Sequence, residues 1–265
     1  MRRMIGLLAP AVMLLALPWQ QGDEAQSVTA LVPSEASLEE VLARMDAMEK
    51  ARVAALRNYS SLRRYRLENH RFGTKAEIRA RMNFQHPGTK TVEILSEQGS
   101  GIIRKRVLGR LIKEEVDAAR EDVRTATRID PDNYTFRLEG TQEQQGRRCY
   151  VLEAVPKRRH KHLLRGRIWV DLEDAAIVRI EGAPAQKPSF LIRKTSFVHT
   201  YEKFGQFWLP VSNHSTSDVL IYGRAEVTVE YSDYRVNDDR ASGSPASTRP
   251  LIDPTAPGTI VTPGR

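Results

Sequence analysis

Apolar and polar side chains alternate along most of the chain between Tyr65 and Tyr234. This period of two is typical of strands that bury one face and expose the other. Turn-forming segments such as His86-Pro87-Gly88 separate successive stretches. Strands do not alternate with helical segments, so the pattern predicts an antiparallel meander and disfavours a parallel nucleotide-binding sheet.

The alternating stretches divide into a series of predicted strands. The clearest begins at Ile78, where apolar and charged residues alternate as far as Phe84. Further strands are predicted at residues 65–67, 91–95, 134–139, 149–155, 167–172, 176–181, 190–201, 206–212, 218–222 and 225–234.

Two segments follow a helical period instead. Ser37 and Glu40 form a capping-box sequence, and apolar residues then recur at helical spacing to about residue 57. A second amphipathic segment spans residues 102–116, with its basic residues opposite its apolar stripe. The second helix could cover a core, act as a movable lid or lie on a membrane surface, and its pattern favours the core-covering interpretation.

The N-terminus predicts export. Arg2 and Arg3 precede an apolar run at residues 4–17, shorter than the roughly 20 residues of a membrane-spanning helix. We interpret residues 1–25 as a secretory signal peptide and expect a periplasmic or otherwise exported protein. An uncleaved anchor remains the alternative, because no sharp cleavage site is present.

Composition divides the remaining chain into three parts. Residues 26–35 are interpreted as a flexible lead, and residues 36–236 as one domain without an internal linker or repeat. Residues 237–265 are rich in Pro, Gly and Ser, which bury little apolar surface. We therefore predict a disordered tail.

The chain carries a formal net charge of +8, which favours contact with an anionic surface. Export disfavours nucleic acid as the partner and leaves anionic lipid headgroups or an acidic envelope protein. The densest basic segment predicts anion contacts from Lys157, Arg158, Arg159 and Lys161. A solvated loop is the competing interpretation.

No catalytic motif stands out in the sequence. It contains neither G-x-S-x-G nor a glycine-rich phosphate-binding motif. His160 and His162 are two possible metal ligands among several cations, and Cys149 fits a small buried strand residue. Asp171 and Asp174 fit a turn. We expect no catalytic residues, no metal, no cofactor and no enzymatic activity.

Three stretches resemble successive hairpins of a known superfamily. They are residues 166–171 (GRIWVD) with 176–180 (AIVRI), residues 201–210 (YEKFGQFWLP) and residues 227–234 (VTVEYSDY). Together with the order of helices and strands behind a signal, they resemble the LolA/LolB superfamily of periplasmic lipoprotein carriers, which includes RseB-type sensors. The resemblance covers roughly residues 36–236 and concerns strands and turns rather than a site.

The resemblance implies an α+β fold in which a curved, mostly antiparallel sheet forms an incomplete β-barrel covered by helices. Its concave apolar face would receive acyl chains. The candidate cavity and lid residues are the apolar positions Ile78, Met82, Phe84, Val92, Ile94, Leu108, Leu111, Ile112, Phe136, Leu138 and Trp169. Each of them could equally be ordinary core.

Three functions stay open at this point. The first is a non-enzymatic envelope protein that binds or carries lipids or the acyl chains of lipoproteins. The second is an RseB-like sensor or scaffold that binds an envelope protein through its basic face and tail. The third is an enzyme acting on envelope polymers. The basic segment at 157–162 and the Pro-rich tail depart from the carriers and put lipoprotein shuttling in doubt.

Overall fold

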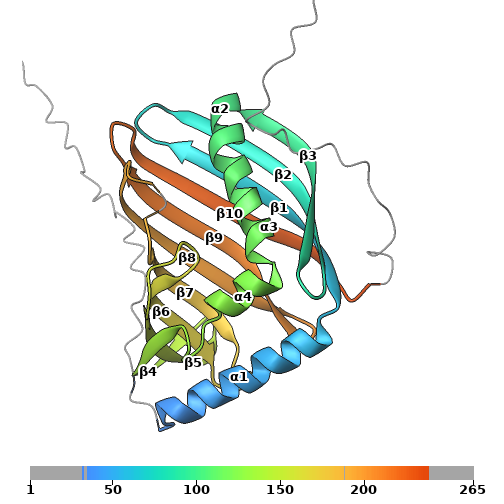
Figure 1. Cartoon of the computed structure of the whole chain (residues 1–265), viewed down its shortest axis with the longest axis vertical. Helices are drawn as coiled ribbons and strands as arrows, with labels where there is room; N and C mark the ends of the chain where they lie inside the picture. The colour runs from blue at the N-terminus through green and yellow to red at the C-terminus, as the bar shows by residue number, and fades with distance from the viewer. Residues whose placement is uncertain (1–31, 33–34, 188, 239–265) are drawn as a thin grey trace, which may run out of the picture. The chain divides into compact units, whose positions relative to one another are not determined.

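The computed structural model describes residues 32, 35–187 and 189–238. The predicted signal peptide, most of the lead and most of the tail lie outside these residues. The strands of the described part join in one ten-stranded sheet (Figure 1). They are β1 (Asn58–Asn69), β2 (Thr74–Gln85), β3 (Thr89–Gly99), β4 (Tyr134–Gln144), β5 (Arg147–Pro156), β6 (Leu164–Asp171), β7 (Ile177–Pro184), β8 (Ile192–Phe204), β9 (Phe207–Val219) and β10 (Gly223–Val236).

The strand order is β3-β2-β1-β10-β9-β8-β7-β6-β5-β4, with every neighbouring pair antiparallel. Two meanders, β1–β3 and β4–β10, meet where β1 pairs with β10. The outer strands β3 and β4 do not pair with each other, so the sheet stays open. The predicted fold class, a mostly antiparallel sheet forming an incomplete barrel, is confirmed.

In the described part of the chain, four α-helices and one π-helical turn accompany the sheet. Their bounds are α1 (Leu38–Ala55), α2 (Gly101–Ile103), the π-helical turn η1 (Arg104–Leu108), α3 (Gly109–Ala118) and α4 (Glu121–Thr127). The helical run from α2 to α3 crosses one face of the sheet, and α1 lies near one end of the strands (Figure 1). The covering role predicted for the second helix is therefore confirmed.

The start of α1 follows from its local sequence. The Ser37 Oγ accepts a hydrogen bond from the Glu40 N–H at 3.2 Å, and Glu40 Oε2 accepts one from the Ser37 N–H at 2.9 Å. This reciprocal pair satisfies two N–H groups that a helix start leaves without intrahelical partners. The predicted capping box is confirmed.

Three predicted strand boundaries were wrong. Strand β1 begins at Asn58, before the predicted start at Tyr65, and β9 runs past the predicted end at Ser212 to Val219. The strand predicted at residues 218–222 is therefore the end of β9 and the turn before β10. Residues 212–218 are polar on both faces. Ladder hydrogen bonds with β8 and β10 hold these residues in the sheet although their side chains give no alternation.

Glycines allow one close backbone approach within the sheet. Gly166 of β6 lies opposite Gly182 of β7, and a Cβ at Gly166 would collide with the backbone oxygen of Glu181. A glycine within a strand commonly marks such a close approach or bend. Any larger residue at this pair would force the two strands apart.

Candidate functional site

The face crossed by α2, η1 and α3 is here called the covered face. Directly paired residues share a face of a sheet, so the register identifies its side chains from strand to strand. One such row contains, from β2 to β4, Ile78, Tyr65, Val229, Asn213, His199, Ile180, Ile168, Leu152 and Leu138. The covered face is thus largely apolar on both flanks and polar in the middle.

The first apolar flank lies beneath the helical run. Leu108 and Ile112 are 0% and 2% exposed and pack on a cluster from β1, β2 and β10. Those sheet residues are Tyr65, Leu67, Ala76, Ile78, Ala80 and Val229. In η1 the Gly109 N–H donates to the Arg104 carbonyl, a five-residue step. Burying each of the two helix side chains contributes roughly 1.5–3 kcal/mol.

The second apolar flank lies against α1. Val41 and Met45 of this helix pack on buried side chains of β4–β7. These are Tyr134, Phe136, Tyr150, Leu152, Ala154, Ile168, Val170 and Ile180. The two flanks are separate clusters, so α1 and the α2–α3 run cover different parts of the sheet.

The polar middle contains three aromatic residues in contact. The His199 ring lies 4.6 Å from the Tyr201 ring and 6.0 Å from the Tyr231 ring, measured between centroids. His199 Nδ1 is 3.3 Å from the Tyr201 hydroxyl, and its buried Nε2 has no hydrogen-bond partner in the described part of the chain. Burial lowers the pKa of His199 to about 4, so its imidazole is neutral at pH 7.

A buried ion cluster connects α3 to the sheet. The Arg63 side chain is 0% exposed, and its Nη2 lies 3.4 Å from Glu115 Oε1. Glu115 also accepts hydrogen bonds from Lys90 at 3.2 Å and from the Tyr65 hydroxyl at 2.8 Å. Burial alone would raise the pKa of Glu115, but Lys90, Arg63 and the Tyr65 hydrogen bond hold this pKa below its usual range.

The guanidinium of Arg63 has further contacts on β10. It lies 4.2 Å from the Tyr231 ring centroid, and its Nη1 is 3.3 Å from the Tyr234 hydroxyl. Its Nε has no hydrogen-bond partner among the described residues. Two cations therefore share one carboxylate beneath α3, and a positive charge is in excess.

The sequence prediction missed this cluster. Arg63 occupies an inward position of β1, and Glu115 follows Leu108 and Ile112 on the buried side of the helix. A cation on one apolar stripe and a carboxylate on another are the signal that could have suggested a buried pair. Their pairing requires knowledge of where the helix crosses the sheet.

The predicted cavity residues occupy different places. Ile78, Met82 and Phe84 are buried along the covered side of β2, and Val92 packs on the same flank. Ile94 and Leu111 are 46% and 37% exposed.

The other predicted residues divide between the two faces. Phe136 and Leu138 belong to the flank beside α1. Trp169 lies on the opposite face, in a cluster with Cys149, and the Arg179 guanidinium is 5.7 Å from its ring centroid. The structure therefore gathers Ile78, Val92, Leu108 and Ile112 beneath or beside the helical run. It places Phe84 in a different cluster, with Tyr59 and Phe207, and Trp169 on the opposite face.

The predicted anion-contact residues lie in the loop between β5 and β6. Arg158 hydrogen-bonds to Asn133 and the Ala126 carbonyl, and Lys161 pairs with Glu114 of α3. Lys157 and Arg159 are exposed. Half of this basic set is thus engaged in holding the loop against the helices.

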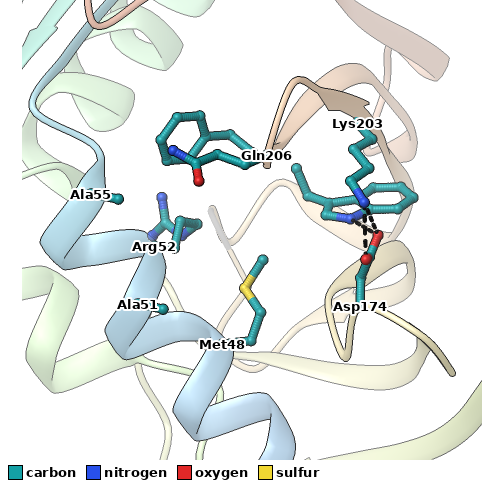
Figure 2. A pocket seen from close by; sticks show the side chains of 9 residues that line it. Met48, Ala51, Arg52, Ala55, Asp174, Lys203 and Gln206 are labelled. Carbon is teal, nitrogen blue, oxygen red and sulfur yellow. Dashed lines mark hydrogen bonds and ion pairs between the residues drawn. The ribbon is translucent and has the colours of Figure 1, made fainter.

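A separate pocket of about 340 Å³ lies between α1 and the β8–β9 hairpin (Figure 2). Met48, Phe207 and Trp208 contribute apolar surface to it. On one side Lys203 contacts Asp174 at 2.8 Å, and the Trp208 Nε1 donates to the same carboxylate at 2.9 Å. Asp174 thus links the Lys203 and Trp208 side chains on this wall of the pocket.

The turn prediction for two aspartates is confirmed. Asp171 Oδ1 accepts hydrogen bonds from the backbone N–H groups of Glu173 and Asp174 at 3.0 Å and 2.7 Å. This arrangement is a typical Asp-capped turn. Within the residues that the structure describes, no three His, Cys, Asp or Glu gather as a possible metal site.

None of the described helices is long and apolar enough to cross a bilayer.

A family model described as an uncharacterized protein matches residues 115–241. None of the curated proteins matches the chain. Several solved structures resemble the chain at low sequence identity.

One is a domain from Vibrio parahaemolyticus described as a candidate outer membrane lipoprotein-sorting protein. It is 13% identical, with a TM-score of 0.42 over 76% of this chain and 94% of that chain. A LolA superfamily protein from Nitrosomonas europaea is 13% identical, with a TM-score of 0.41 over 77% and 94%. The MucA/MucB complex from Pseudomonas aeruginosa includes a chain 12% identical, with a TM-score of 0.25 over 75% and 99%.

Proposed function

We propose that this protein is a non-enzymatic, exported cell-envelope protein that binds lipids or the acyl chains of lipoproteins on its covered face. The observation that supports the proposal is the arrangement of the helical run. It buries Leu108 and Ile112 on a continuous apolar area of β1, β2 and β10, and one ion cluster ties it to the sheet. Displacing this run would expose a ready-made apolar surface.

The energies make an acyl chain a suitable replacement. Each buried methylene contributes about 0.8 kcal/mol, so ten methylenes contribute roughly 8 kcal/mol. Withdrawing two buried helix side chains costs about 3–6 kcal/mol. Breaking the Arg63–Glu115 pair adds up to about 3–5 kcal/mol. The helix would therefore move only when a long apolar ligand fills the space beneath it.

The test is lipid analysis of full-length protein purified without detergent from its native envelope. We expect stoichiometric acyl-containing species in the organic extract by mass spectrometry. Val227→Asp places a carboxylate beside the buried flank, whereas Thr228→Asp places one on the opposite face of the same strand. The first variant should lose the lipid and the second should retain it.

Two results would contradict the proposal. One is an extract with no acyl species above that of an unrelated exported protein. The other is equal lipid retention in the folded Val227→Asp and Thr228→Asp variants, because a ligand on the covered face would lie nearer to residue 227 than to residue 228.

A sensor or scaffold that binds an envelope protein is the second candidate. It is favoured by the edge strand β3, on which Ile94 and Leu95 are 46% and 44% exposed. An open edge of this length can accept an extended segment as an additional strand. Recovery of a stoichiometric protein partner without lipid, lost when Leu95 is changed to Pro, would support this function over the first.

A further inference from the structure

Large apolar side chains are exposed on several loops of the sheet. Phe190 is 87% exposed, Ile221 76%, Ile102 71%, Phe72 56% and Tyr222 53%. These five residues are here called the tip surface. Single exposed apolar residues are ordinary, but a group of this size marks an interaction site in soluble proteins.

The strand register places all five at the same end of the sheet. Phe72 lies in the β1–β2 turn, and the end of β1 pairs with the start of β10, next to the β9–β10 turn with Ile221 and Tyr222. Phe190 precedes β8, whose start pairs with the end of β9, and Ile102 follows β3, whose end pairs with the start of β2. Figure 1 shows the β1–β2 and β9–β10 turns side by side.

Six neighbouring strands, from β3 to β8, carry these loops. With strands roughly 4.8 Å apart, the tip surface extends over about 24 Å. That width suits an extended surface better than a small ligand.

The two central turns hold each other in place. Arg71 Nη1 donates to the Ile221 carbonyl at 3.0 Å, and Asn69 Nδ2 donates to the Tyr222 carbonyl at 2.9 Å. The Phe72 and Tyr222 rings meet edge to face at 6.0 Å. The exposed side chains are therefore presented by a hydrogen-bonded pair of turns and are ordered before any partner binds.

Ile221 adds a second observation. Its φ is 71°, a left-handed conformation that β-branched residues rarely adopt and that Gly or Asn would accept at lower cost. Local strain of this kind is found where a side chain serves a function. At this turn it keeps an isoleucine pointing into solvent, where it contributes nothing to the core.

Cations surround the tip surface. Arg71, Lys187, Arg193 and Lys194 are exposed near the tips, and the described residues include no ion-pair partner for any of these four. Among the carboxylates at this end of the sheet, Glu226 is engaged with His70 and Arg224, and Asp218 lies opposite Lys194 in the strand register. Apolar tips flanked by unpaired cations are complementary to a bilayer with an acidic headgroup layer.

We propose that the tip surface docks on a bilayer containing anionic lipids, with Phe72, Phe190, Ile221 and Tyr222 entering the headgroup region. The inference does not depend on a ligand on the covered face. It does have a consequence for that face, because the α2–α3 run begins at the same end of the sheet and would start beside the membrane.

The experiment measures vesicle binding by the full-length chain. Vesicles of phosphatidylcholine with phosphatidylglycerol, in a ratio of about three to one, are compared with phosphatidylcholine alone. The variant combines Phe72→Ser, Phe190→Ser, Ile221→Asn and Tyr222→Ser, since Asn accepts the conformation at 221. The control is Leu95→Ser, which removes an exposed apolar side chain in the middle of edge strand β3.

We expect the fourfold variant to bind the anionic vesicles at least about tenfold more weakly, and the control to bind like the wild type. Binding to neutral vesicles should be weak throughout. Equal binding by the fourfold variant and the control would overturn the proposal, as would equal binding to neutral and anionic vesicles. Capture of an envelope protein by the tips without vesicle binding would also overturn it.

A second measurement shows directly which part of the bound chain enters the bilayer. A nitroxide is attached at Phe190→Cys or at Leu95→Cys; the native Cys149 is 0% exposed and should not react. In the bound state, the nitroxide at 190 should be reached by oxygen dissolved in the bilayer, and the one at 95 by a polar relaxation agent. A water-exposed nitroxide at 190 on bound protein would refute docking by the tips.

Discussion

The Glu115→Gln variant tests whether the ion cluster holds the helical run on the sheet. Gln keeps the size of the side chain and can still accept the Tyr65 hydrogen bond, but it cannot neutralise the Arg63 guanidinium, whose side chain is 0% exposed. Removing one partner of a buried pair costs about 3–5 kcal/mol. Because the Glu115 side chain is 21% exposed and Lys90 14%, water compensates in part, and we expect about 2–3 kcal/mol.

The cost should appear first as local opening of α3. Hydrogen exchange measures such opening residue by residue, and about 1.4 kcal/mol corresponds to a tenfold change. Amides of Gly109–Ala118 should therefore exchange roughly 30- to 150-fold faster in the variant. Amides of β5–β7 should keep their wild-type rates, because a different cluster stabilises those strands.

Glu114→Gln is the matched control on the same helix. Glu114 pairs with Lys161 near the surface, where ion pairs contribute about 0–1 kcal/mol. Equal exchange of α3 in the two variants would refute the reasoning. A double variant with Arg63→Met provides an independent check, since removal of the buried cation should recover part of the loss, and additive effects would show that the two residues are not coupled.

Two further predictions concern the sheet itself. Burial lowers the pKa of His199 to about 4, so between pH 6.5 and pH 4 the unfolded chain binds the extra proton and stability falls as pH decreases. In a plot of the free energy of unfolding, measured in urea, against pH, His199→Phe should remove up to roughly 3 kcal/mol of this decrease. Parallel wild-type and variant curves would contradict the assignment. Gly166→Ala should lower the free energy of unfolding by about 3 kcal/mol or more, because its Cβ meets the β7 backbone. A Cβ at Gly146 meets no atom within 4 Å, so Gly146→Ala should cost only about 1 kcal/mol, which is the strain of its positive φ of 74°. An equal loss in the two glycine variants would argue against the close approach of β6 and β7.

The sequence predicted those helices and strands whose conformation is set by residues a few positions apart. The Ser37–Glu40 box starts α1 because both partners lie within one helical turn. The alternation at Ile78, Met82 and Phe84 correctly separates the two faces of β2 for the same reason. Alternation did not predict the second half of β9, where polar side chains occupy both faces and pairing with the neighbouring strands holds the segment extended.

The candidate site depended on contacts that the sequence could not connect. The period of two assigns faces within one strand, but it cannot say which face of β6 continues the inward face of β2. Trp169 was grouped with Ile78 for this reason, although the register places the two on opposite faces. Alternation within one strand does not show which of its two faces continues a given face of another strand, because the intervening turns and helices can reverse the assignment.

The sequence by itself determined that the chain forms an amphipathic N-terminal helix, antiparallel strands and a second amphipathic segment, because periodicity and capping act over a few residues. The tertiary structure alone decided that β1 pairs with β10, that Glu115 meets Arg63, and that Phe72 and Tyr222 share one end of the sheet. These partners are far apart in the sequence: Leu62 and Ser232 by 170 positions, Arg63 and Glu115 by 52, and Phe72 and Tyr222 by 150. Such contacts form only when the packing of the whole sheet repays the entropy of closing long loops.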